Sequence, residues 1–128
     1  MANRRTKEPP AVRCEVIELP REMWSQLLGL HPAFSAVAPV DGWSVQWRTW
    51  VPICLSAISA ELTKNRDDRV RIRGAVLAWH WVSEWLLAIA WSPKMHQLQR
   101  QIAAQIGGQI VVTMAPYFAI ESFAAEVP

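Results

Sequence analysis

Apolar residues recur every three to four positions over most of the chain after residue 20, which is the spacing of one face of an α-helix. The longest such stretch runs to Trp91 and can be capped by Asp67 or Asp68. Its polar residues share one narrow side of a helical wheel, and apolar residues cover most of the rest, as is typical of a central helix. The polar set is Arg69, Arg73, His80 and Glu84. We therefore predict an all-α fold, a compact bundle of about five helices around a long central helix at about 68–91.

Two helices are expected before the central helix. The first begins at Pro20 and is stopped by Gly29, after which residues 31–42 form a turn-rich connection. The second has Ser44 as its N-cap and ends by residue 65, with a kink or a restart at Pro52.

Two further helices are expected after it. Ser92 and Pro93 form an N-cap and first-turn pair that opens one helix, and the pair Gly107 and Gly108 should end it. A short closing helix then covers residues 117–125.

Two short segments have the character of strands. Residues 14–19 alternate apolar and acidic side chains, and Gln109 to Met114 is rich in β-branched residues. A lone strand is not stable, and each segment has only the other as an obvious partner. Whether Gln109 to Met114 is strand or helix therefore stays open from the sequence.

The chain of 128 residues suits one domain. Residues 1–13 are basic and contain two prolines, without an apolar period, which predicts a flexible basic arm. The remaining residues, 14–128, are predicted to form a single helical domain.

The eight tryptophans indicate a protein that binds another protein. Three of them follow one another at i, i+4 and i+7 on one helical stripe, and a compact interior is not expected to hide all eight indoles. We predict a non-catalytic helical accessory protein, such as a regulator, inhibitor or subunit, that docks on a larger protein or on its own copy. The expected anchors are Trp24, Trp43, Trp47 and Trp50.

Charge suggests a second hypothesis, a nucleic-acid-binding regulator. The net charge is only +2, but residues 64–73 carry five basic side chains against two acids, and the arm is basic too. The phosphate contacts would come from Arg4, Arg5, Lys7, Arg66, Arg69, Arg71 and Arg73.

No arrangement of residues predicts catalysis, a metal site or a cofactor. Cys14 and Cys54 lack the spacing of a disulfide framework or a zinc site. His80 and Glu84 lie one helical turn apart and are interpreted as a structural pair, because nothing places a nucleophile or further ligands beside them. Phosphate-binding loops and hydrolase motifs are absent from the sequence, so we expect neither an enzyme nor a small-molecule substrate.

The apolar stretch over residues 74–91 superficially resembles a membrane span. Its polar residues would lie at mid-depth, where they cost most, and its tryptophans lie away from the interfaces that they prefer. Membrane association is therefore not expected, and the basic start lacks the apolar region of a secretory signal. These features predict a cytoplasmic protein.

Overall fold

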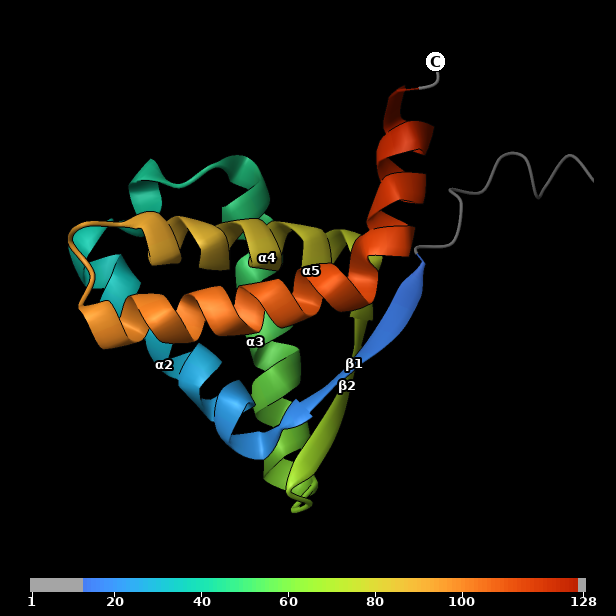
Figure 1. The fold of residues 1–128 in the computed structure, drawn as a ribbon, viewed down its shortest axis with the longest axis horizontal. Coiled ribbons are helices and arrows are strands. Elements are labelled where there is room, and N and C mark those ends of the chain that lie inside the picture. Colours follow the sequence, from blue (N-terminus) through green and yellow to red (C-terminus); the bar gives the residue numbers. More distant parts are fainter. Residues whose placement is uncertain (1–12, 127–128) are drawn as a thin grey trace, which may run out of the picture.

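The computed structural model describes residues 13–126, with side chains described as far as Phe118 (Figure 1). The predicted arm therefore lies almost wholly outside the described residues. The elements are β1 (Cys14–Pro20), α2 (Arg21–Val37), the short 3-10 helix η1 (Val40–Gly42), α3 (Val45–Lys64), β2 (Arg69–Ala75), α4 (Val76–Trp91) and α5 (Gln97–Glu126). A mostly helical fold is confirmed. Within the described residues it consists of four α-helices and a two-stranded sheet, where the sequence predicted about five helices.

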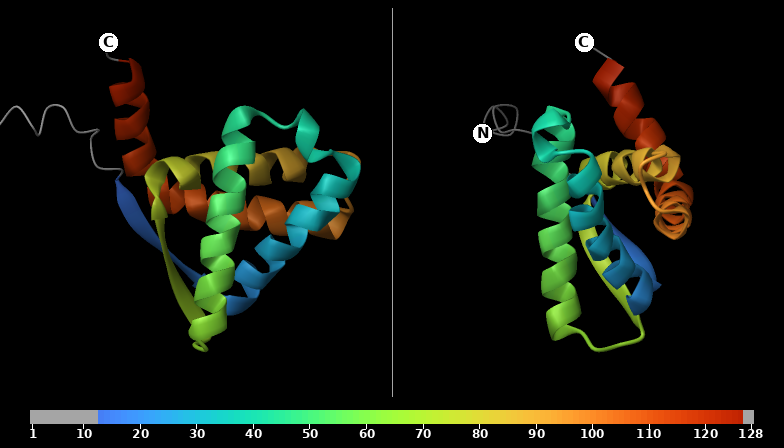
Figure 2. Two further views of the ribbon diagram at one scale, coloured as in Figure 1. Left: turned by 180° about the vertical axis from the view of Figure 1, so that it is seen from behind. Right: turned by 90° about the vertical axis from the view of Figure 1, so that its left-hand side faces the viewer.

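The helices cross in two layers. α4 and α5 lie side by side and antiparallel, and α4 packs across α3 (Figures 1 and 2). α2 contacts both α3 and α5, while the sheet lies beside α3, with β2 against α3 and β1 against α2. The C-terminal part of α5, drawn in red, turns away from the other helices (Figure 1), and Pro116 lies inside this helix.

The predicted central helix at 68–91 is wrong at its N-terminal end. Residues 69–75 form β2, which pairs antiparallel with β1, and the helix begins only at Val76. Arg69 to Arg73 alternate charged and apolar residues, a period of two that buries Val70 and Ile72 on one side of a strand. A helix would have spread these side chains around its circumference. The extended segment predicted at 14–19 is confirmed, and its partner is β2, not residues 109–114.

Gly29 and the pair Gly107 and Gly108 were wrongly predicted to end helices. α2 continues through Gly29 and Pro32 because Leu30 and Phe34 extend its buried stripe. The turn-rich connection is therefore shorter than the predicted range 31–42.

α5 likewise runs without a break from Gln97 to Glu126, so residues 109–114 and the predicted closing helix are parts of one helix. Its buried side chains recur at helical spacing across the glycine pair. They are Ala103, Ile106, Ile110 and Met114.

α3 begins as predicted, since the Ser44 hydroxyl accepts a hydrogen bond from the backbone N–H of Trp47 at 3.2 Å. It continues through Pro52 to Lys64 as one helix. At its C-terminal end the Arg21 guanidinium donates to the backbone carbonyls of Leu62 and Asn65. A cation at this end donates hydrogen bonds to carbonyls that the helix leaves unpaired, and it interacts favourably with the negative end of the helix dipole.

Tryptophans join the sheet to the helices. Trp24 on α2 donates from Nε1 to the carbonyl of Val70 at 2.9 Å, and Trp79 on α4 donates to the carbonyl of Glu15 at 3.2 Å. The two indoles are fully buried, with ring centroids 5.9 Å apart. Each strand is thus held by one indole from a different helix.

Candidate nucleic-acid interface

Three arginines lie on one face of β2. Arg69, Arg71 and Arg73 are exposed, while the intervening Val70 and Ile72 are buried. Successive side chains of a strand point to opposite faces, so the three guanidinium groups leave the same side at intervals of about 7 Å along the backbone. We call this set, Arg69, Arg71 and Arg73, the arginine face.

The neighbouring strand neutralises only part of this charge. β1 places Val16 opposite Arg73, Glu18 opposite Arg71 and Pro20 opposite Arg69. The Glu18 carboxylate pairs diagonally with Arg69, with 3.0 Å between Oε2 and Nε. Three arginines against one carboxylate leave a net charge of about +2 on this side of the sheet, and an exposed pair of this kind contributes little to stability.

The loop before β2 is held by one hydrogen bond within it and by one to the start of α2. The Asn65 side chain accepts from the backbone N–H of Asp67 at 2.9 Å, and the carbonyl of Asp68 accepts from the backbone N–H of Arg21 at 2.7 Å. Arg66 is exposed in this loop. Asp67 and Asp68 are exposed beside it, so the loop at residues 65–68 has a net charge of about −1 and the positive charge is concentrated on the strand.

The other predicted phosphate contacts, Arg4, Arg5 and Lys7, lie outside the described residues. Arg13, the first described residue, pairs with Glu15 at 3.6 Å and lies over the ring of Tyr117, with its Cζ 5.1 Å from the centroid.

The four tryptophans expected to anchor a partner do not form one exposed patch. Trp24 and Trp43 lie in the core, where Trp43 stacks with Phe34 at a centroid distance of 5.8 Å. Trp47 is half-buried with its ring edge-on to Trp43 at 6.2 Å, and Trp50 is half-buried farther along α3. The stripe at i, i+4 and i+7 therefore runs from the core toward the surface.

The most exposed indole is not one of the four predicted anchors. Trp91, the last residue of α4, is 79% exposed, and Leu98 on the first turn of α5 is 61% exposed. The position of Trp91 directly before the pair Ser92 and Pro93 was the available signal, because a side chain at a helix end has fewer neighbours to cover it.

His80 and Glu84 approach one another without forming a site for chemistry. His80 Nε2 lies 3.9 Å from a Glu84 carboxylate oxygen, and its ring meets those of Trp81 and Phe118 at centroid distances of 4.8 and 5.2 Å. Across residues 13–126, no group of three or more His, Cys, Asp or Glu side chains is placed to hold a metal ion.

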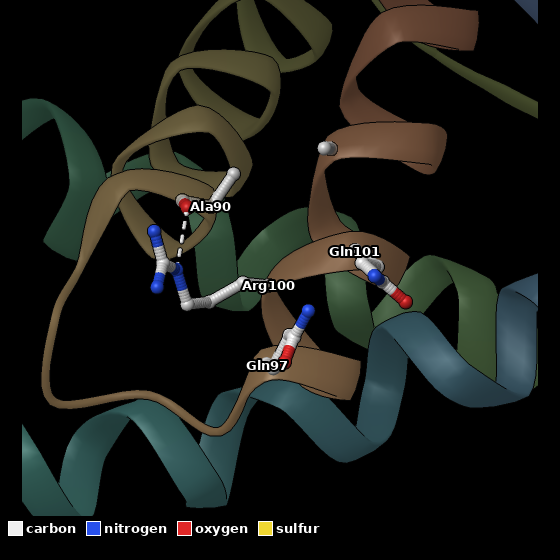
Figure 3. A pocket seen from close by; sticks show the side chains of 5 residues that line it. Ala90, Gln97, Arg100 and Gln101 are labelled. Atoms are coloured by element: carbon white, nitrogen blue, oxygen red, sulfur yellow. Dashed lines mark hydrogen bonds between the residues drawn. The ribbon is translucent and has the colours of Figure 1, made fainter.

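A cleft of about 350 Å³ lies between the end of α4 and the start of α5 (Figure 3). Arg100 on its wall donates from Nε to the carbonyl of Ala90 at 3.0 Å, so the guanidinium caps the last turn of α4. Gln97 and Gln101 lie apart from it along α5 (Figure 3). The cation in this cleft is therefore already used to stabilise the fold.

No helix in the described part of the chain combines the length and the apolar character needed to cross a bilayer. α4 is the most apolar of the helices, but it has 16 residues, and its buried side packs within the fold.

The buried Cys54 thiol on α3 makes stability depend on alkaline pH. Desolvation by burial raises the pKa of Cys54 from 9.0 to about 12. Above pH 9 the thiol ionises in the unfolded chain and stays protonated in the folded one, so the free energy of unfolding should fall as pH rises. We expect a loss of about 1.4 kcal/mol per pH unit between pH 9 and 12.

Urea unfolding at pH 8, 9, 10 and 11 measures this loss, and Cys54→Ala is the control because it removes the thiol while other alkaline titrations remain. The difference between the two proteins should grow with pH. Parallel stability curves would contradict the assignment.

Comparison with protein-family models, with characterised proteins and with solved structures found no match to this chain.

Proposed function

We propose that this chain is a non-catalytic nucleic-acid-binding protein that holds phosphates with the arginine face. The supporting observation is that three exposed arginines leave the same side of a strand whose opposite side is anchored in the core. Guanidinium groups bind phosphate oxygens through pairs of parallel hydrogen bonds, and they release counterions from the nucleic acid as they do so.

The anchoring of β2 supports this proposal. The strand is fixed by its ladder to β1, by the Trp24 hydrogen bond to Val70 and by its packing against α3. Arginines on a fixed strand lose less freedom on binding than arginines on a loop, so a larger share of the contact energy appears as affinity. The basic residues Arg4, Arg5 and Lys7 precede β1 in the sequence and add further positive charge to the chain.

The test is the salt dependence of binding to an oligonucleotide, measured by fluorescence anisotropy between about 50 and 200 mM salt. Each phosphate contact contributes about one unit to the slope of log K against log salt. The double variant Arg71→Gln/Arg73→Gln should therefore lower this slope and weaken binding by about tenfold or more. These two arginines have no ion-pair partner among the described residues.

Arg48→Gln is the matched control, since Arg48 is an exposed arginine on the first turn of α3, outside the arginine face. It should leave the slope nearly unchanged. Binding that does not respond to salt, or that Arg48→Gln weakens as much as the double variant, would contradict the proposal.

Docking on a protein partner or on a second copy is the second candidate, and the exposure of Trp91 and Leu98 favours it. Indoles concentrate binding energy at protein interfaces. The same salt series separates the two candidates, because an association through apolar side chains persists at about 200 mM salt. An association that persists there and is lost in Trp91→Ala would favour this candidate.

A further inference from the structure

An apolar slot lies beside the arginine face. Its lining residues come from α3, from the end of β2 and from the start of α4, and its volume is about 130 Å³. Figure 2 (left) shows these three segments passing one another. Trp50, Ile53 and Ala57 line it from α3, which is the spacing of one helix side. Arg73 and Gly74 of β2 and Trp79 of α4 contribute to the remaining wall.

The slot has the size and polarity for one six-membered ring. An engineered apolar cavity of about 150 Å³ binds benzene, so about 130 Å³ suits a single ring rather than a fused pair. Ile53 at its mouth is 55% exposed, and Trp50 is half-buried. A flat ring that enters would cover apolar surface that is now in contact with water.

Gly74 contributes to this shape by having no side chain. A Cβ at this position would lie 3.0 Å from Cε2 of the Trp79 indole, so Trp79 lies directly over the strand at the base of the slot. A larger residue would push the indole aside and change the cavity.

Arg73 lines the slot and also belongs to the arginine face, while Ile72, which lines the slot too, lies on the buried side of the same strand. A ligand that fits both features carries a flat ring next to a run of anionic groups. We propose that the slot takes one pyrimidine base of a single-stranded nucleic acid whose phosphates lie along Arg73, Arg71 and Arg69. This inference rests on the proposed function and adds the class of nucleic acid to it.

Single strands fit this arrangement better than duplexes. In a duplex the bases are stacked and paired, so a base can enter an apolar slot only after it is extruded at a cost. In a single strand every base offers a free ring face, and stacking of bases on aromatic side chains is a general mode of recognition. An aromatic side chain of an acidic protein has similar chemistry, but three arginines in a row match a regular run of phosphates more closely.

The experiment compares three probes of equal length on the whole protein: a twelve-nucleotide oligo(dT), an abasic strand with the same phosphates, and a duplex. Oligo(dT) should bind about tenfold more tightly than the abasic strand, because the contribution of one stacked base is of this order. It should also bind more tightly than the duplex. Equal binding of oligo(dT) and the abasic strand, or tighter binding of the duplex, would overturn the inference.

Ala57→Leu tests the slot itself. Ala57 is exposed and lines the slot, so the larger side chain fills it without changing charge or removing a core contact. This variant should bind oligo(dT) and the abasic strand equally, with the salt slope unchanged. Ala60→Leu is the matched control, because Ala60 is an exposed alanine of the same helix that does not line the slot, and it should behave as the wild type.

The outcomes separate the two proposals. If Arg71→Gln/Arg73→Gln weakens all three probes while Ala57→Leu changes nothing, the slot inference fails and the proposed function stands. If none of the probes responds to the arginine variant, the proposed function fails and the slot inference fails with it. An acidic peptide with one phenylalanine that binds more tightly than oligo(dT), and loses this in Ala57→Leu, would assign the slot to a protein partner and overturn the inference.

Discussion

Replacing Trp79 by alanine is expected to lower the free energy of unfolding by about 3–5 kcal/mol, the usual cost of truncating a fully buried large aromatic side chain. The indole has no exposed surface, lies 5.9 Å from that of Trp24 and donates a hydrogen bond to the carbonyl of Glu15. Truncation leaves a cavity between the sheet and α4 and removes the bond from α4 to β1. Urea unfolding followed by circular dichroism measures the loss.

Trp91→Ala is the control for this prediction, because Trp91 lies on the same helix and is 79% exposed. Its substitution should change the free energy of unfolding by about 0.5 kcal/mol or less. Equal effects of the two substitutions would show that Trp79 is not at the junction of sheet and helix.

Gly74→Leu gives a second test of the same contact. In the wild type the new side chain meets the Trp79 indole, since even a Cβ would lie 3.0 Å from Cε2. In the Trp79→Ala background the leucine instead enters the vacated space. The two substitutions should therefore be non-additive, with the double variant more stable than the sum of the single losses implies.

The helical part of the fold could largely be predicted from the sequence, because helix formation depends on contacts three and four residues apart. Ser44 caps α3 as expected. The apolar stripe predicted for α4 corresponds to a nearly continuous buried side of this helix in the structure. The sheet could not be predicted in the same way. β2 is stable only because it pairs with β1, whose residues lie 49 to 61 positions earlier in the chain, and the sequence suggested residues 109–114 as the partner of β1.

The local sequence pattern of β2 is also compatible with a helix. Arg69 and Arg73 fall on the same side of a helical wheel as His80 and Glu84, so the strand resembled the first turns of the helix that follows it. The alternation over Arg69 to Arg73 covers only five residues, which is too short to exclude a helix by period alone.

The residues of the candidate site could be predicted from the sequence, but their arrangement in space could not. The arginines of the proposed interface were identified by charge, but their common orientation follows from the strand. Trp50 was selected as part of a stripe with Trp43 and Trp47, and of these three the structure places only Trp50 at the slot. The slot joins side chains of α3, β2 and α4, and no local pattern indicates which of these segments meet.

Gly107→Leu is expected to lower the free energy of unfolding by about 2 kcal/mol, because the new side chain overfills a packed contact. Gly107 is buried where α5 packs against α4, and a Cβ there would lie 3.3 Å from the Cβ of Leu86 and 3.6 Å from Cδ2 of Leu87. A leucine adds three more carbons at this contact, and overpacking of a well-filled interior costs about 3 kcal/mol at the upper end of its usual range. The gain in helix propensity over glycine, about 0.8 kcal/mol, offsets only part of this cost.

Gly108→Leu is the matched control, because a Cβ on this neighbouring glycine of the same helix would have nothing within 4 Å of it. This substitution should raise the free energy of unfolding by up to about 0.8 kcal/mol through helix propensity alone. Thermal and urea unfolding of the two variants should therefore move in opposite directions. If both glycines were helix ends, as the sequence pattern suggested, leucine at either would destabilise, so opposite signs would also establish in solution that α5 continues through the pair.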